Sequence, residues 1–163
     1  MMGMVKEIFR AILGRLRLLR LRIAHPRLSI DSRGFYCGRG CFASRKNTIT
    51  IARNFYMGNF CHLAADAVIG ADVLFASYVS LVGGDHKIDN IVGTFRDSGR
   101  DVLKTIRIAD NVWVGHGAIL MHGISIGSGS VIAAGAVVTS DVQENAIVGG
   151  NPARLIRYRE TGS

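Results

Sequence analysis

Aliphatic residues return at every sixth position across the stretch 108–142, and this is the clearest pattern in the chain. A second apolar or small residue stands four places after each of them. A period of six fits neither a 3.6-residue helix nor a two-residue strand. It is typical of a parallel β-helix, in which each short strand contributes one inward side chain before the chain turns a corner. The aliphatic positions are Ile108, Val114, Leu120, Ile126, Ile132 and Val138.

The same period runs through the first half of the chain, with interruptions. Ile30, Tyr36 and Phe42 predict one early coil, and residues 45–50 break the phase and are predicted to form a small loop. Because three hexapeptides make a triangular coil, four full coils are expected, at 51–68, 69–86, 108–125 and 126–143. The repeat in the first two of these is carried by Ile51, Met57, Leu63, Ile69, Phe75 and Leu81.

Two segments after residue 86 lack the repeat. Residues 87–107 are polar and mixed in charge, and so long an insertion in a regular solenoid is either functional or disordered. Its position directly after His86 favours function. Residues 144–159 are predicted to leave the repeat, and the last few residues to fray. We therefore expect a helix at 1–26, a solenoid at 27–157 with its inserted loop, and a C-terminal tail at 158–163.

The N-terminal segment combines basic residues with apolar residues at three- and four-residue steps, which predicts an amphipathic helix that becomes irregular over 15–23 and ends at Pro26. Two placements stay open. The helix packs on the side of the solenoid with its arginines solvated, or it lies on an anionic membrane surface, where it would meet a lipid-linked substrate.

Composition narrows the class of protein. The net charge of +8 indicates an anionic partner, but no recognition helix, zinc finger or aromatic–basic motif points to nucleic acid. Three cysteines cannot pair completely, which favours reduced thiols in a cytosolic protein. No apolar run reaches the length of a transmembrane helix, and arginines interrupt the apolar stretch that a signal peptide would need. A cytoplasmic location is expected, with peripheral contact at the inner membrane face if the helix binds lipid.

Four blocks of sequence resemble the hexapeptide-repeat acyltransferases, in particular the maltose/galactoside O-acetyltransferase branch and its relatives in bacterial polysaccharide synthesis. The blocks are NFYMGNFCHLAAD (54–66), DHKID (85–89), ADNVWVGHGAIL (109–120) and VVTSDVQENAIVGGNPARLIR (137–157). The resemblance implies an all-β fold, a left-handed parallel β-helix with a short N-terminal helix and a long loop between coils. It also implies a homotrimer, acetyl-CoA as co-substrate, a sugar or glycan acceptor and no metal.

His86 matches the catalytic histidine of that family. Acetyl transfer from a thioester to a hydroxyl requires a base, and a neutral imidazole titrates near working pH. The resemblance also implies acceptor contacts from Asn59, Asp66, Asp89 and Trp113. Asn59 and Asp66 also fit the role of a corner residue of the coil. Asp89 could instead orient a ring, and Trp113 could pack against the loop or line the donor channel.

The resemblance places acetyl-CoA in a groove between neighbouring solenoids. The residues that match donor-binding positions are Trp113, Gly115, Ala133, Ala134, Thr139, Arg154 and Arg157. The small residues would let the pantetheine arm approach the backbone, and the arginines would pair with phosphate. Two departures stand out. Ser140 replaces the lysine common after the threonine of the TSD block, and the N-terminal segment is shorter than in maltose-type enzymes, which puts the acceptor in doubt.

Three other functions stay open. N-acetylation of an amino sugar would use the same histidine. A γ-class carbonic anhydrase would need three histidines on zinc, and His86, His116 and His122 are available, but His116 and His122 are six positions apart where that family spaces its pair by five. A non-catalytic hexapeptide scaffold would need neither His86 nor the donor groove.

Overall fold

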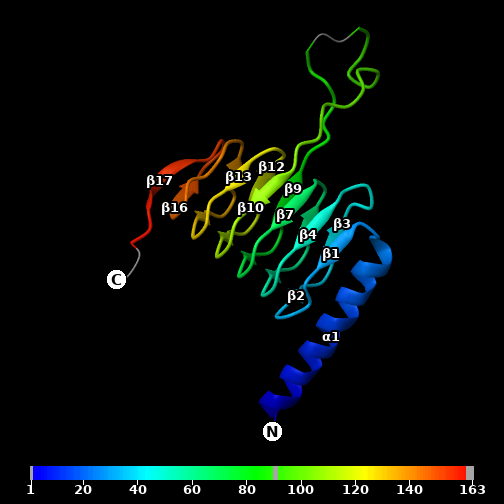
Figure 1. Cartoon of the computed structure of the whole chain (residues 1–163), viewed down its shortest axis with the longest axis vertical. Helices are drawn as coiled ribbons and strands as arrows, with labels where there is room; N and C mark the ends of the chain where they lie inside the picture. The colour runs from blue at the N-terminus through cyan, green and yellow to red at the C-terminus, as the bar shows by residue number, and fades with distance from the viewer. Residues whose placement is uncertain (1, 90–91, 161–163) are drawn as a thin grey trace.

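The computed structural model describes residues 2–89 and 92–160, with the side chains of the first helix described from Ile12 onward. One helix, α1 (Met2–Ala24), precedes seventeen short strands that wind into a three-sided prism (Figure 1). Each side of the prism is a sheet of parallel strands from successive coils. The inward side chains of the three sheets form one continuous core along the prism axis.

The three sheets are named here A, B and C. Sheet A holds β1 (Leu28–Ile30), β4 (Ile49–Ile51), β7 (Ala67–Ile69), β10 (Ile106–Ile108) and β13 (Ser125–Ile126). Sheet B holds β2 (Tyr36–Cys37), β5 (Tyr56–Met57), β8 (Leu74–Phe75), β11 (Trp113–Val114), β14 (Val131–Ile132), β16 (Ala146–Gly149) and β17 (Arg154–Tyr158). Sheet C holds β3 (Phe42–Ala43), β6 (His62–Leu63), β9 (Ser80–Val82), β12 (Ile119–Met121) and β15 (Val137–Val138).

The predicted inward columns are confirmed from residue 51 to residue 142. All twelve repeat positions are buried, and so are their companions four places on, except Asp85, which follows Leu81 where the repeat stops. Parallel pairing keeps them in register, as in the contacts of Ile51 with Ile69 and of Ile108 with Ile126. Ser130 is the polar member of this core, and its hydroxyl donates to the Gly127 carbonyl at 2.7 Å, which satisfies it.

The prediction for the first coil is wrong by one residue. Tyr36 and Phe42 face outward, and Cys37 and Ala43 take the inward positions. The corner after Ile30 contains one extra residue and turns at Gly34, whose φ of 67° suits glycine. The loop predicted at 45–50 is also too long, because β4 already begins at Ile49.

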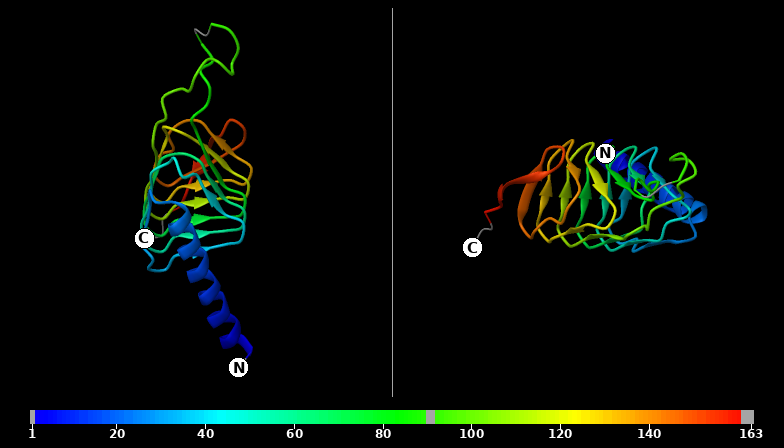
Figure 2. Two further views of the ribbon diagram at one scale, coloured as in Figure 1. Left: turned by 90° about the vertical axis from the view of Figure 1, so that its right-hand side faces the viewer. Right: turned by 90° about the horizontal axis from the view of Figure 1, so that it is seen from above.

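Helix α1 closes the N-terminal end of the prism and is continuous to Ala24, without the predicted irregularity. It packs on β1 and β2 through Leu18 and Leu21, each burial worth about 1.5–3 kcal/mol. The Arg17 guanidinium donates to the Cys37 carbonyl at 3.1 Å. The helix extends well past the prism (Figures 1 and 2). No helix among the described residues is both long and apolar enough to cross a membrane.

The inserted loop extends from the prism between β9 and β10, on the side opposite the N-terminal end of α1 (Figure 2). At the C-terminus the repeat continues further than predicted, because β16 adds a parallel strand to β14. Strand β17 then turns back antiparallel to β16 and takes the predicted tail as far as Tyr158 into the sheet. The fraying predicted for the last residues concerns 161–163, which lie outside the described residues. Cys37, Cys41 and Cys61 are free thiols.

Candidate functional site

His86 lies in the neck of the inserted loop, at the edge where sheet C passes into sheet A. The two limbs of the neck pair through a bridge between His86 and Arg100, and the Asp101 amide donates to the Asp85 carbonyl at 2.8 Å. The Arg100 guanidinium donates to the Gly84 carbonyl at 2.8 Å. The half-buried imidazole keeps its Nδ1 atom buried without a hydrogen-bond partner among the described residues. The neck therefore holds the backbone of His86 in place and leaves the Nδ1 atom of its ring without a partner among the described residues.

His122 supports this neck from the next coil. The Lys104 amide donates to His122 Nδ1 at 3.3 Å. Gly83 packs so closely on His122 that a Cβ at position 83 would lie 2.7 Å from the His122 Cβ. Asp89 lies further out on the loop and is exposed. The structure therefore attaches His86 to the solenoid and leaves Asp89 on the outer part of the loop.

Asn59 and Asp66 both act as corner residues. The Asn59 Oδ1 atom accepts the Arg39 amide at 3.0 Å, one coil away. The Asp66 Oδ1 atom accepts the Thr48 amide at 2.8 Å and the Asn47 Nδ2 amide at 3.2 Å. These hydrogen bonds connect neighbouring coils. Each side chain therefore stabilises the fold, independently of any contact with the acetyl acceptor. Their role in acceptor binding stays a prediction.

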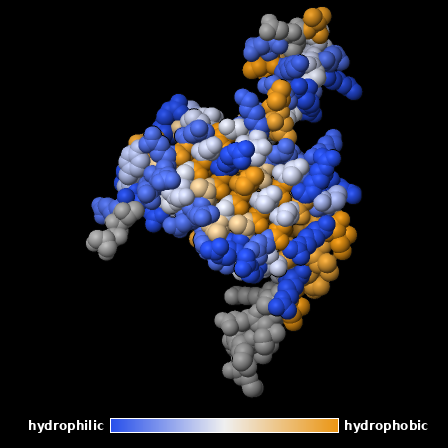
Figure 3. Space-filling model, in the orientation of Figure 1, coloured by the Kyte–Doolittle hydropathy of each residue, from blue (hydrophilic) through white to orange (hydrophobic). Residues whose placement is uncertain are grey.

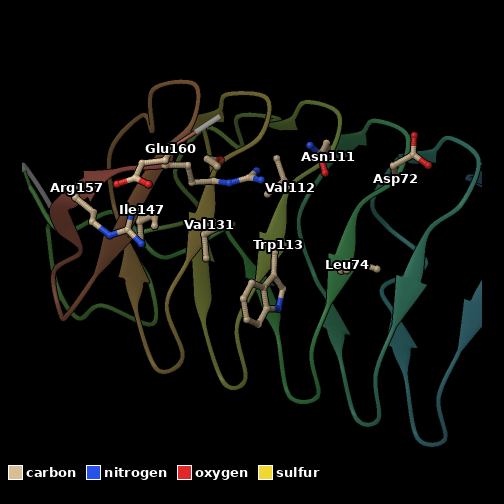
Figure 4. Close-up of a pocket in the computed structure, with 11 residues that line it drawn as sticks. Asp72, Leu74, Asn111, Val112, Trp113, Val131, Ile147, Arg157 and Glu160 are labelled. Atoms are coloured by element: carbon tan, nitrogen blue, oxygen red, sulfur yellow. The ribbon is translucent and has the colours of Figure 1, made fainter. Parts of the chain in front are cut away.

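Trp113 points outward from sheet B and is 54% exposed. Trp113 and Arg157 both line a cavity of about 590 Å³, with Arg157 beside Ile147 and Val131 between them and Trp113 (Figure 4). Arg159 and Glu160 also line this cavity, and the Arg159 guanidinium is tied to the Gly129 carbonyl at 2.7 Å. The lining therefore combines the Trp113 ring with the cationic side chains of Arg157 and Arg159, which suit a ligand that carries negative charge, and with the carboxylates of Asp72 and Glu160.

Gly115, Ala133 and Ala134 lie at the corner between sheets B and C. A Cβ on Gly115 would meet the Ala134 amide nitrogen at 2.5 Å, so the close stacking of coils already requires glycine there. Ala134 is exposed. Thr139 is exposed at the other corner, between sheets C and A, beyond the end of β15. Arg154 lines a cavity of about 250 Å³ at the C-terminal end of the prism, together with Ser140 and Asp141.

The predicted residues are spread around the prism, with Asn59, Gly115, Ala133 and Ala134 at the corner between sheets B and C. His86, Asp66 and Thr139 follow the edge between sheets C and A, whereas Trp113 and Arg157 lie on sheet B, the face opposite that edge. A single chain does not bring the candidate base to the Trp113 cavity. The separation is a direct result of the triangular coil, in which an edge and the opposite face are separated by the core.

Sequence reasoning missed an aromatic ladder at the corner between sheets B and C. Phe60 and Tyr78 adopt positive φ values of 55° and 63°, which bulky residues rarely adopt. Their rings stack 5.3 Å apart, with Arg39 over Phe60 and His116 5.2 Å from Tyr78. Backbone strain of this kind clusters at functional sites. Phe60 and Tyr78 occupy the same turn position that glycine occupies in later coils, at Gly117 and Gly135. An aromatic residue at a position suited to glycine is the signal that could have identified the ladder.

The three histidines considered for zinc lie at two different corners. His116 belongs to the ladder between sheets B and C, whereas His86 and His122 lie between sheets C and A. Among the residues that the structure describes, no group of three or more His, Cys, Asp or Glu side chains is arranged to hold a metal ion.

Known proteins similar to this chain share its architecture. Residues 105–140 match the family model described as bacterial transferase hexapeptide (six repeats). A galactoside O-acetyltransferase of Escherichia coli is 36% identical over 119 residues, which cover 71% of this chain and 57% of that protein. The chain spans 54–59% of the length of three curated relatives that it matches.

Two solved structures extend the comparison. A maltose O-acetyltransferase from Clostridium difficile 630 has a TM-score of 0.64 and 31% identity, with 82% of this chain and 67% of that chain covered. A galactoside acetyltransferase in complex with coenzyme A has a TM-score of 0.62 and 28% identity, covering 80% of this chain and 65% of that chain. The prediction of a left-handed parallel β-helix with one N-terminal helix is confirmed.

Proposed function

The chain belongs to the hexapeptide-repeat acyltransferase family, and from that premise we propose that it transfers an acetyl group from acetyl-CoA to a hydroxyl of a sugar or glycan precursor. The observation that carries the proposal is the imidazole of His86 in the loop neck, whose Nδ1 atom has no partner among the described residues. The named activities of the galactoside and maltose relatives, and the coenzyme A of one of them, support the donor and the acceptor class.

His86 acts as the general base in this proposal. Its Nε2 atom takes the proton of the acceptor hydroxyl while the hydroxyl oxygen attacks the thioester carbonyl. The tetrahedral intermediate collapses, the carbon–sulfur bond breaks, and the imidazolium returns the proton to the CoA thiolate. General-base assistance of this kind contributes about 10²–10⁴ in rate. Trp113 and Arg157 hold the donor, and Gly115, Ala133, Ala134, Thr139 and Arg154 are the remaining donor contacts.

We further propose that the active unit is a homotrimer. On one chain the edge that carries His86 and the face that carries Trp113 lie on opposite sides of the core, so a second copy is needed to bring them together. Sheet B also exposes Tyr56, Leu74 and Trp113, an apolar strip that a neighbouring copy would cover. Light scattering on the purified protein tests the stoichiometry, and a monomer with full activity would contradict it.

Contact with an anionic membrane is the last element of the proposal. Opposite its buried face, α1 exposes an apolar stripe formed by Ile12, Leu16, Leu19 and Ile23, visible as the band along the helix in Figure 3. Arg15 and Arg22 on one side, and Arg20 on the other, flank this stripe. Vesicles of phosphatidylglycerol should therefore retain the parent protein and release the variant Leu16→Ser/Ile23→Ser. Val68→Ser, an exposed apolar residue of sheet A, is the matched control.

The catalytic proposal is tested by acetyl-CoA turnover with a panel of sugars, comparing the parent with His86→Ala. His62→Ala removes an exposed histidine on β6 and is the control. We expect the His86 variant to bind acetyl-CoA but to lose at least about 100-fold in turnover. Binding without turnover by either protein would favour a scaffold, and product on an amino group would favour N-acetylation. Turnover that survives His86→Ala would reject the base assignment.

A further inference from the structure

A cavity of about 790 Å³ lies between α1 and the first coil, and no residue assigned to acetyl transfer lines it. Cationic side chains come from both of its walls, two from the helix and three from the coil. They are Arg17, Arg20, Arg39, Arg45 and Lys46. No carboxylate belongs to this described lining.

No carboxylate pairs with the cationic side chains of this cavity within the part of the chain that the structure describes. Among the described residues, the one ion pair joins Asp31 to Arg33, and neither of these residues lines the cavity. Arg17 is engaged only with the Cys37 carbonyl, and Arg39 only with the Phe60 ring. A cleft lined by one sign of charge and backed by a low-dielectric wall concentrates the opposite ion. The lining therefore selects an anion.

His25 gives a second and independent sign of a ligand. The residue is 6% exposed, and its Nδ1 atom is buried without a hydrogen-bond partner among the described residues. Its ring lies edge-on to Phe42, with centroids 5.8 Å apart, in the wall of the same cavity. Burial first, and the charge of Arg45 second, lower the pKa of this imidazole. A buried nitrogen without a partner is costly unless a water or an ion completes it.

The size and the apolar wall of the cavity define the rest of the ligand. The volume far exceeds that of a single inorganic ion, and the lining includes apolar side chains from both walls, Leu21 and Ala24 from α1 and Phe42 from the coil. A phosphate monoester has three terminal oxygens and can accept paired hydrogen bonds from more than one arginine. A carboxylate has only two oxygens and can satisfy fewer of these donors. Arg20 stands at the rim, next to the exposed apolar stripe of α1, so both a soluble ester and a lipid headgroup have access.

We infer that this cavity binds a phosphate monoester, with the phosphoryl group held by Arg20 and Arg45 beside the His25 ring and the organic part against Leu21 and Phe42. The site is separate from the proposed acetyl-transfer site and does not depend on that proposal. The bound phosphate adds the negative charge that the lining lacks and lies beside the His25 ring.

The test titrates glycerol 3-phosphate into the full-length protein and follows binding by calorimetry and the His25 imidazole by NMR. The parent should bind, and the pKa of His25 should rise because an anion now faces the ring. The variant Arg20→Gln/Arg45→Gln should lose at least about 10-fold in affinity. Arg53→Gln/Arg107→Gln removes two exposed arginines elsewhere and should bind like the parent. Equal weakening in both pairs would show non-specific charge and overturn the site.

A second arm separates the two sources of the phosphate. The affinity for nanodiscs that contain phosphatidate is compared with the affinity for soluble glycerol 3-phosphate. Both are measured on the Leu16→Ser/Ile23→Ser variant, which keeps the cavity but lacks the exposed apolar stripe of α1. Tighter binding to phosphatidate, lost in Arg20→Gln/Arg45→Gln, would identify a lipid headgroup. Equal or tighter binding of the soluble ester would identify a soluble ligand. If neither ligand binds the parent, or if the His25 resonances do not move, the inference fails regardless of whether the protein transfers acetyl groups.

Discussion

Gly83 lies against His122, one coil away, with no room between them for a Cβ atom. The same added atom would also meet the Leu103 Cδ1 atom at 2.7 Å. Position 83 therefore sets how closely the two limbs of the loop neck approach the solenoid, three residues before His86.

Gly83→Ala should push the neck away from the prism. We expect a loss of about 1–3 kcal/mol in the free energy of unfolding from overpacking. We also expect a fall in kcat larger than any change in KM for acetyl-CoA, because the neck orients His86 and not the donor. Gly14→Ala, where nothing lies within 4 Å of the added atom, is the control and should be neutral or stabilising. Unchanged kcat in Gly83→Ala would separate the neck from the chemistry.

Asp66 is expected to contribute to the free energy of unfolding, whereas Asp89 is not. Asp66→Ala removes the acceptor of the Thr48 amide and of the buried Asn47 amide, and should cost about 1–3 kcal/mol in the free energy of unfolding. Asp89→Ala changes an exposed loop residue and should leave that free energy unchanged. Urea unfolding of the two variants makes the comparison. Equal stability in both would argue that the corner bonds of Asp66 contribute nothing.

The regular part of the fold was predictable because each inward position repeats the same physical requirement. From Ile51 to Val142 a small triangular interior accepts apolar or small side chains at the same positions of each hexapeptide, and this requirement is visible in the sequence. The first coil was not predictable in this way. Tyr36 keeps the aromatic character of a core residue but stacks on Tyr56 outside, 4.8 Å away, while the smaller Cys37 fills the interior.

The candidate site was predictable in its residues but not in its arrangement. His86 stands out because it interrupts a repeat and begins a loop. His86 and Trp113 lie on opposite sides of the core because of the sheets that their neighbouring strands join. The sequence does not show this directly, because the 87–107 insertion interrupts the six-residue period from which the sheet of each strand could be counted. The cationic cavity was also out of reach, because it exists only when α1 packs on the first coil and brings Arg20 towards Arg45.

Trp113 offers a direct test of donor binding because it is the single tryptophan of the chain. If the donor enters the cavity that Trp113 shares with Arg157, adding acetyl-CoA should change the indole emission in a saturable way. Arg157→Gln should weaken this binding by at least about 10-fold, the usual size of a lost hydrogen bond to a charged group. Arg53→Gln should match the parent. A saturating titration that leaves the emission of Trp113 unchanged would place the donor elsewhere.

His25 should make the stability of the protein depend on pH near neutrality. Burial, and then the charge of Arg45, lower the pKa of its imidazole in the folded state below the value of 6.5 expected in the unfolded chain. The unfolded state therefore binds the proton more readily, so this contribution is fully present above about pH 6.5 and is lost as the pH falls below it. Urea unfolding at pH 7.5 and pH 5.5 should show a larger loss for the parent than for His25→Gln. Phosphate that binds beside His25 should reduce the loss in the parent, because the protonated ring then gains an anionic partner. Equal losses in the parent and in His25→Gln would mean that other groups set the acid sensitivity of the fold.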